Sequence, residues 1–220
     1  MLKKEFSIAF IGTDGSGKST IINQVKPVLN EIFTNGVHYE HMRPNYIPSI
    51  AILLGSDKEK PNGPVTNPHG SSESGIFGSL VRWSYYMLDY TFGFYKKVYS
   101  IKANKSRVWI FDRYYYDYLI DPKRSRIKLP KWILRMGQFI IPEPDIILCL
   151  GADSEIMHNR KPELPLHEVK RQVTELKLFC ANHKRAVWID TGKSIEESSK
   201  ETMEAIIKVM AKRFESVKLV

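Results

Sequence analysis

The sequence predicts an α/β fold in which one parallel sheet of five strands has helices on both faces. Two observations carry this prediction: short apolar runs typical of buried strands recur along the chain, and longer segments with helical periodicity separate them. The five runs are Phe6 to Ile11, Val37 to His41, Val108 to Phe111, Asp145 to Leu150 and Ala186 to Ile189. Because parallel strands need crossover connections, which are usually helices, this alternation indicates repeated strand, helix and strand units.

The segments between these runs carry apolar residues at the spacing of amphipathic helices. In the segment Lys18 to Phe33 they lie on one face, although Pro27 is expected to kink this helix or end it early. The longest segment, Ser79 to Ala103, repeats its large apolar residues about every 3.6 positions, so we expect them in the core or an interface. Further helices are expected over Pro130 to Ile140, Leu166 to His183 and Ser194 to Phe214. The last of these opens with a capping box of Ser194 and Glu197.

Length and composition favour a single domain over residues 1 to 220. The chain has 220 residues, of which 43% are apolar, enough for one sizeable core. The stretch Gly55 to Gly75 is rich in Pro, Gly, Ser and Asn, so it is predicted to be a long mobile loop. Cys149 and Cys180 are interpreted as core residues rather than a disulfide, which favours a reducing compartment. The apolar run near the N-terminus is too short for a signal sequence or a membrane span, so we expect a cytoplasmic protein with no membrane partner.

The net charge of +9 favours an anionic partner, which could be a nucleotide, a phosphorylated metabolite, nucleic acid or acidic lipid. The chain has no block of five or six like charges and no recognisable nucleic-acid-binding motif. We therefore expect no nucleic-acid partner.

A phosphate-binding motif follows the first predicted strand. It matches GxxxxGK[ST], the pattern of a P-loop, and consists of Gly12, Thr13, Asp14, Gly15, Ser16, Gly17, Lys18 and Ser19. At this place, backbone N–H groups and the N-terminus of the next helix can surround phosphate oxygens. Lys18 should then contact the β- and γ-phosphates of ATP, and Ser19 should bind Mg²⁺, with Thr20 closing the nucleotide-binding segment. The motif predicts the P-loop NTPase fold, with ATP and Mg²⁺ as cofactors.

A second pair of charged residues follows the third predicted strand. Four apolar residues lead into Asp112 and Arg113, which would lie in the crevice at the carboxyl end of the sheet. A P-loop enzyme commonly holds its magnesium ion with such a carboxylate, so Asp112 is the second expected metal ligand.

Several motifs occur in a specific order: the P-loop, Arg43 after the second strand, Arg82-Trp83 in the long helix, and Asp112-Arg113-Tyr114 after the third strand. In this order they resemble thymidylate kinases and related nucleoside monophosphate kinases, and the likeness extends from the P-loop to the C-terminal helix. It implies an ATP-dependent kinase that transfers the γ-phosphoryl group to a nucleoside monophosphate, with dTMP the first candidate. It also implies a homodimer formed through the helix Ser79 to Ala103 and its neighbour, because that helix carries more large apolar residues than one buried face requires.

The resemblance assigns roles to individual acceptor-binding residues. Asp14 would face the sugar of the acceptor, Arg43 and Arg113 would hold its phosphate, and Arg82 would contact its base. Guanidinium groups suit both tasks, because they bind phosphate bidentately and can also contact or stack on a base.

The segment Asp153 to Leu166 takes the place of the family's lid. Because the P-loop has no arginine, a cation from this lid must neutralise the charge of the transferring group; Arg160 is the first candidate and Lys161 the second. Lys18, Asp112, Arg113 and Arg160 are thus the predicted catalytic residues. The loop Asp190 to Lys193 corresponds to the segment that lies beside adenine in the family.

The residues after Asp112-Arg113-Tyr114 depart from the family's pattern. Thymidylate kinases usually continue with a serine and an aromatic residue, whereas here Asp117 and Asp121 occupy this neighbourhood and the basic cluster Lys123 to Arg126 follows. A reshaped acceptor pocket is expected, with Asp117 as one of its residues. The acceptor could then be a nucleoside monophosphate or a neutral hydroxyl compound such as a sugar, for which Asp112 or Asp117 would act as base. A nucleotide-regulated binding protein is the third alternative.

Overall fold

The computed structural model describes residues 6–41, 47, 75–94 and 107–215. Its strands are β1 (Phe6–Ile11), β2 (Val37–His41), β3 (Val108–Asp112), β4 (Ile146–Gly151) and β5 (Ala186–Asp190). They form one sheet in the order β2-β3-β1-β4-β5, and every described pairing is parallel. The predicted five-stranded parallel sheet is confirmed.

The strand boundaries agree with the prediction to within one residue at each end. All residues of β3 and β4 are buried. A central parallel strand is covered on both faces, so its sequence is a continuous apolar run.

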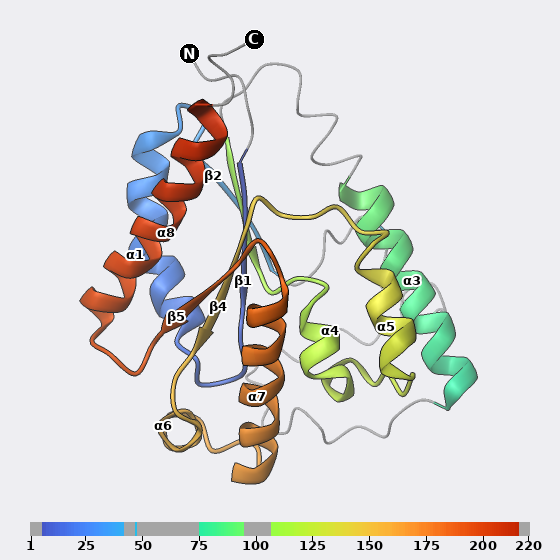
Figure 1. Cartoon of the computed structure of the whole chain (residues 1–220). Helices are drawn as coiled ribbons and strands as arrows, with labels where there is room; N and C mark the ends of the chain where they lie inside the picture. The colour runs from blue at the N-terminus through green and yellow to red at the C-terminus, as the bar shows by residue number, and fades with distance from the viewer. Residues whose placement is uncertain (1–5, 42–46, 48–74, 95–106, 216–220) are drawn as a thin grey trace, which may run out of the picture.

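Helices cover both faces of the sheet (Figure 1). They are α1 (Lys18–Ile32), α3 (Ile76–Phe94), α4 (Asp117–Ile120), α5 (Lys131–Gly137), α6 (Ser154–Arg160), α7 (Leu166–Asn182) and α8 (Ile195–Glu215), with the 3₁₀ helix η2 (Pro122–Ser125). One core cluster joins the sheet to α1 and α8, and a second joins its other face to α3, α4, α5 and α7.

Several helix boundaries differ from the prediction. Pro27 does not end α1, which continues to Ile32, because Val25 and Leu29 on either side of the proline are buried against the sheet. Helix α3 begins at Ile76, three residues earlier than expected, and residues 95–103 of the predicted helix lie outside the described residues. Helix α5 is shorter than predicted at both ends. Its expected last turn, 138–140, leaves Phe139 and Ile140 exposed, so little packing holds that turn in a helix.

Other expectations concern the loops, the thiols and the membrane. Most of the predicted mobile loop, residues 55–74, lies outside the described residues. Cys149 and Cys180 are free thiols, as predicted. Within the described ranges, the helices are all too short or too polar to cross a membrane.

The topology brings the charged motifs to one edge of the sheet. β1 lies between β3 and β4, and its register pairs Phe10 with Asp112. The loop that leaves β1 therefore lies beside the residues that end β3. Parallel sheets bind ligands at this edge.

Candidate functional site

The loop Gly12 to Ser19 joins β1 to α1 in a tight turn that fits between neighbouring elements. Gly15 has φ 78°, a left-handed conformation that disfavours other residues, and a Cβ placed there would lie 2.5 Å from the Met157 carbonyl oxygen. Gly17 caps the N-terminus of α1 with φ 76°. Helix α6, in the segment predicted to be the lid, thus packs directly on the loop.

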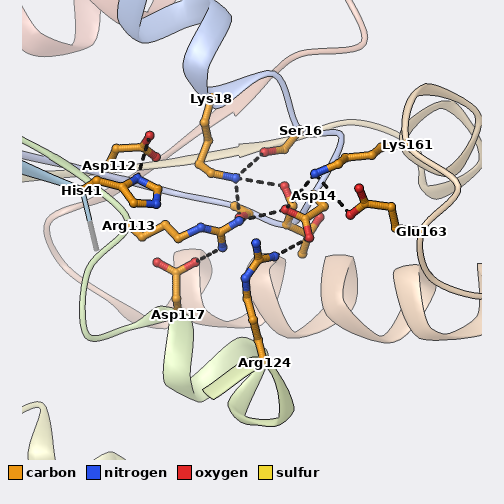
Figure 2. Close-up of polar contacts among 12 residues, drawn as sticks. Asp14, Ser16, Lys18, His41, Asp112, Arg113, Asp117, Arg124, Lys161 and Glu163 are labelled. Atoms are coloured by element: carbon orange, nitrogen blue, oxygen red, sulfur yellow. Dashed lines mark hydrogen bonds and ion pairs between the residues drawn. The ribbon is translucent and has the colours of Figure 1, made fainter. Parts of the chain in front are cut away.

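Lys18 is buried inside this loop. Its ammonium Nζ donates to the carbonyl oxygens of Gly12, at 2.7 Å, and Thr13, at 3.0 Å, and lies 3.2 Å from Ser16 Oγ (Figure 2). Burial, assisted by the nearby charge of Arg113, lowers the pKa of Lys18 to about 7. An anionic phosphate would offer the ammonium a stronger partner than the carbonyls do, so the loop holds Lys18 ready for one.

Two buried threonine hydroxyls fit the expected nucleotide. Thr13 Oγ1 and Thr191 Oγ1 are buried, and neither has a hydrogen-bond partner among the described residues. Thr191 lies beside the P-loop, since its Cβ is 3.9 Å from where a Cβ on Gly17 would lie. Buried hydroxyls usually have partners, and ATP phosphate or ribose oxygens could satisfy these two. The predicted Asp190 to Lys193 loop therefore adjoins the phosphate-binding loop.

Asp112 ends β3 with a buried carboxylate. Tyr39 Oη donates to its Oδ2 at 2.7 Å, and His41 Nδ1 lies 3.3 Å from the same oxygen. Burial opposes ionisation, but the contacts with His41 and Tyr39 and the charge of Lys18 hold the pKa of Asp112 below its usual value. Asp112 is therefore a stable anion beside the P-loop.

The same region offers oxygen ligands suited to Mg²⁺. The Asp112 carboxylate and the exposed Ser19 hydroxyl are hard donors, and the described residues contain no cluster of three or more metal-binding side chains. Mg²⁺ often uses only one or two protein ligands and takes the rest from phosphates and water. The residues fit a magnesium ion that arrives with ATP.

Arg113 links the end of β3 to the P-loop. Its φ of 74° is unusual for a residue other than glycine, and its backbone N–H donates to the Phe10 carbonyl at 2.9 Å. Its Nη2 donates to Asp14 Oδ1 at 2.9 Å and its Nη1 to Asp117 Oδ1 at 3.3 Å (Figure 2). Burial opposes ionisation of Arg113, but the Asp117 and Asp14 carboxylates raise its pKa above its usual value.

Asp117 and Asp14 hold this arginine from two sides. Asp117 begins α4, and its Oδ2 accepts the Tyr114 backbone N–H at 3.0 Å. Burial raises the pKa of Asp117, in opposition to the charges of Arg113 and Lys18. For Asp14 the balance is the reverse: the charges of Arg113, Arg124, Lys18 and Lys161 outweigh burial and lower its pKa.

Asp14 is the common partner of three cations. Arg113 reaches it from β3, Arg124 Nη1 pairs with its Oδ2 from η2, and Lys161 Nζ lies 3.9 Å from its Oδ1 at the start of the lid loop (Figure 2). Lys161 also pairs with Glu163 at 3.2 Å. The P-loop, η2 and the segment after α6 thus meet at one carboxylate.

Comparison with known proteins identifies the fold. No protein-family model matches the chain, and no curated protein matches its sequence. Among solved structures, thymidylate kinase from Ehrlichia chaffeensis superposes with a TM-score of 0.58 over 92% of this chain and 98% of that one. Thymidylate kinase from Candida albicans gives a TM-score of 0.58 over 93% of this chain and 92% of that one. Both are 18% identical to this chain. The chain has a thymidylate kinase-like fold.

The thymidylate kinase-like fold confirms the predicted P-loop NTPase class and the resemblance seen in the sequence. Six predicted site residues come together in it: Asp14, Lys18, Asp112, Arg113, Asp117 and the second lid candidate Lys161. Ser19 and Thr20 lie exposed in the first turn of α1. Arg43 lies outside the described residues.

The two remaining predicted arginines in the described part of the chain, Arg82 and Arg160, lie on α3 and α6. Arg160 is the exposed last residue of α6 and makes no ion pair within the described part of the chain. Arg82 lies one helical turn before Tyr85 and Tyr86 on α3. Tyr85 Oη donates to the Ile47 carbonyl at 3.0 Å, and the Tyr86 ring stacks on Tyr118 of α4. Arg82 therefore lies on the side of α3 that faces Ile47 and α4.

Sequence reasoning missed the roles of Tyr39, His41 and Arg124. Tyr39 and His41 are alternate residues of β2, and the register places His41 opposite Asp112. That alternation could have shown that both side chains lie on one face of a strand next to β3. Arg124 belongs to the basic cluster that indicated a reshaped acceptor pocket, but nothing in the local sequence singles it out.

Proposed function

We propose that this protein is an ATP-dependent kinase that transfers the γ-phosphoryl group to a nucleoside monophosphate, with dTMP the first acceptor to test. The carrying observation is the convergence of Lys18, Asp112 and Arg113 at the carboxyl ends of β1 and β3, around one phosphate-binding loop. The thymidylate kinase-like fold supports the same proposal.

Catalysis in this proposal is positioning and charge neutralisation, which dominate phosphoryl transfer. Lys18 exchanges its carbonyl partners for oxygens of the β- and γ-phosphates. Mg²⁺, when bound with ATP by Ser19 and Asp112, neutralises phosphate charge. A phosphate acceptor needs no strong general base, because it is already a nucleophilic anion at neutral pH.

The lid supplies a further cation in this proposal. Lys161 already meets the P-loop through Asp14, whereas Arg160 ends the lid helix with an exposed side chain. Both remain candidates for the cation that neutralises the transferring group. Because Lys161 lies closer to the P-loop before any ligand binds, its substitution is the first to test.

A kinase for a neutral hydroxyl compound, such as a sugar, is the second candidate. One observation favours it: Asp117 is buried beside Arg113 with a raised pKa, and a carboxylate with a raised pKa is a stronger base. Such an acceptor must lose a proton as it attacks, and a base would help to remove it.

A coupled ADP-release assay with Mg²⁺-ATP separates these proposals. The acceptor panel contains dTMP, dUMP, the other nucleoside monophosphates and a set of sugars, and Lys18→Ala is the blank for contaminating kinases. We expect turnover with at least one nucleoside monophosphate. Turnover with sugars alone would select the second candidate. ATP binding without turnover on any acceptor would leave a nucleotide-regulated binding protein.

A further inference from the structure

We infer that Arg124 binds the phosphate group of the acceptor directly, while Arg113 serves as a buried tether behind it. The inference rests on the proposed function, because it assumes an acceptor that carries a phosphate. It concerns a residue outside the sequence-predicted site, and it names which of two neighbouring guanidinium groups the acceptor meets.

Arg113 has little left to offer a ligand. Both of its terminal nitrogens already contact carboxylates, Nη2 on Asp14 and Nη1 on Asp117. Its side chain is only 9% exposed. A phosphate that bound Arg113 would share the guanidinium with two buried carboxylates, whose negative charge opposes an incoming anion.

Arg124 is held at one point and open elsewhere. Its Nη1 pairs with Asp14, while its Nε and Nη2 have no partner among the described side chains and carbonyls. Its side chain is 26% exposed. A guanidinium group has five N–H donors in a fixed fork, so Arg124 can keep its ion pair and still donate to phosphate oxygens.

The free space beside the Arg124 side chain is small on the side of Arg113 and Asp117. Behind the network lies a cavity of only about 10 Å³, lined by Arg113, Asp117, Asp121 and Arg124 together with buried tyrosines. Such a space holds about one water molecule. A phosphate group is larger than one water molecule, so the acceptor phosphate does not fit in this space as the side chains stand.

The charges in the network also favour an anion at Arg124. Lys161 has a second carboxylate partner in Glu163, and Arg113 has one in Asp117. Among the described residues, the side chain of Arg124 pairs only with Asp14, which it shares with both other cations. Within the described part of the chain, Arg124 therefore has fewer carboxylate ion-pair partners than Arg113 or Lys161.

The backbone around Arg124 is already in place. Pro122 starts η2, the Asp121 side chain caps it by accepting the Arg124 backbone N–H at 3.4 Å, and Arg126 ends it in a left-handed conformation with φ 55°. A fixed backbone lowers the entropy cost of binding a ligand. The short turn therefore fixes the backbone of Arg124 near the P-loop before a ligand binds.

The test compares Arg124→Ala and Arg124→Lys with Lys123→Ala, a neighbouring exposed cation in the same turn. Steady-state kinetics use dTMP, or whichever nucleoside monophosphate the wild type turns over fastest, and titration calorimetry measures binding of that nucleotide. Arg124→Ala should raise the acceptor KM and Kd by roughly 10- to 100-fold, the effect of losing a charge-assisted contact, with the KM for ATP unchanged. Lys123→Ala should match the wild type.

Arg124→Lys separates ligand binding from a structural role. A lysine can neutralise Asp14 as a point charge, but it lacks the fork that serves two partners at once. It should restore the melting temperature and leave the acceptor KM raised. Full recovery of the acceptor KM in this variant, or an unchanged KM in Arg124→Ala, would overturn the inference alone. A wild type that phosphorylates no nucleoside monophosphate overturns the proposed function, and the inference with it.

Discussion

Arg113 and Asp14 are 99 positions apart in the sequence, yet Nη2 of the arginine lies 2.9 Å from Oδ1 of the aspartate. A second bond, from the Arg113 backbone N–H to the Phe10 carbonyl, joins the same two segments. The end of β3 and the P-loop are therefore one structural unit.

Lys18→Ala should abolish phosphoryl transfer and leave the fold intact. Among the described residues, the hydrogen bonds of the ammonium all go to atoms of its own loop, so its loss removes phosphate binding without opening the hydrophobic core. ADP release and circular dichroism measure the two effects. Lys212→Ala, an exposed cation on α8, is the matched control. Near-normal turnover in folded Lys18→Ala would contradict the P-loop assignment.

Binding of ATP should take up a proton at pH 8. Lys18 in the free protein has a pKa of about 7, so at pH 8 it is mostly neutral. Phosphate charge would raise this pKa and restore the ammonium, which draws up to about one proton from the solution. Calorimetry in buffers of different ionisation enthalpy measures the uptake. Lys18→Met should abolish it, and identical binding heats for the wild type in every buffer would refute the prediction.

The sequence predicted the strands of the sheet and the residues that follow them closely. Buried central strands such as β3 and β4 must be apolar throughout, and the polar residue that ends such a run marks the edge of the sheet. By that logic the sequence predicts that Asp112 and Arg113 lie in the crevice at the carboxyl end of the sheet, where the P-loop also lies. The predicted helix boundaries agree less closely with the structure than the strand boundaries do, because packing decides where a helix ends. One example is α1, which continues through Pro27.

The ion pairs around Asp14 could not be predicted from sequence. Arg124 is 110 positions from Asp14, and the basic cluster that contains it offers three cations with no local distinction. The turn made by α4 and η2 brings Arg124 to Asp14, and this turn cannot be predicted from the local sequence. The lid is similar: its sequence favoured Arg160 over Lys161, whereas the end of α6 at Arg160 brings Lys161 to Asp14.

Asp112→Asn should lower turnover by roughly 10²-fold or more at saturating Mg²⁺, through loss of metal positioning. The amide keeps the shape of the side chain but loses the negative charge. Tyr39→Phe is the control, because it removes a hydrogen bond to Asp112 and leaves the carboxylate in place. Its effect should be much smaller. An unchanged rate in Asp112→Asn would assign Asp112 a structural role.

The protein should form a homodimer through α3. Phe77, Val81, Leu88 and Phe92 are exposed and lie on one face of this helix, with Phe77 79% exposed. Light scattering at micromolar concentration should give twice the chain mass, and Phe77→Glu should give the monomer. Ile207→Glu, at an exposed apolar position on α8, should leave the dimer intact. A wild-type monomer would reject the prediction.

Arg82 and Asp117 distinguish the two kinase proposals. If the acceptor is a nucleoside monophosphate, Arg82 contacts its base, and Arg82→Ala should weaken acceptor binding by about 1 to 3 kcal/mol, the cost of losing a charged hydrogen-bond partner. The affinity for ATP should barely change, because the P-loop lies on other elements. Calorimetric titration of each substrate measures both effects.

If the acceptor is a neutral hydroxyl compound, Asp117 would help to remove its proton, and Asp117→Asn should lower turnover by roughly 10²-fold with little effect on acceptor affinity. Burial raises the pKa of Asp117, so the rate should also fall as the pH drops through that raised value and the base becomes protonated. The same substitution also removes the ion pair between Asp117 and Arg113. A pH-rate profile is therefore needed to separate the role of Asp117 as a base from its role as the partner of Arg113. If the fall in rate at low pH disappears in Asp117→Asn, Asp117 acts as a base. If the fall at low pH is unchanged, Asp117 serves only as the partner of Arg113. Loss of turnover in Asp117→Asn, with Arg82→Ala unaffected and no activity on nucleoside monophosphates, would replace the first proposal with the second.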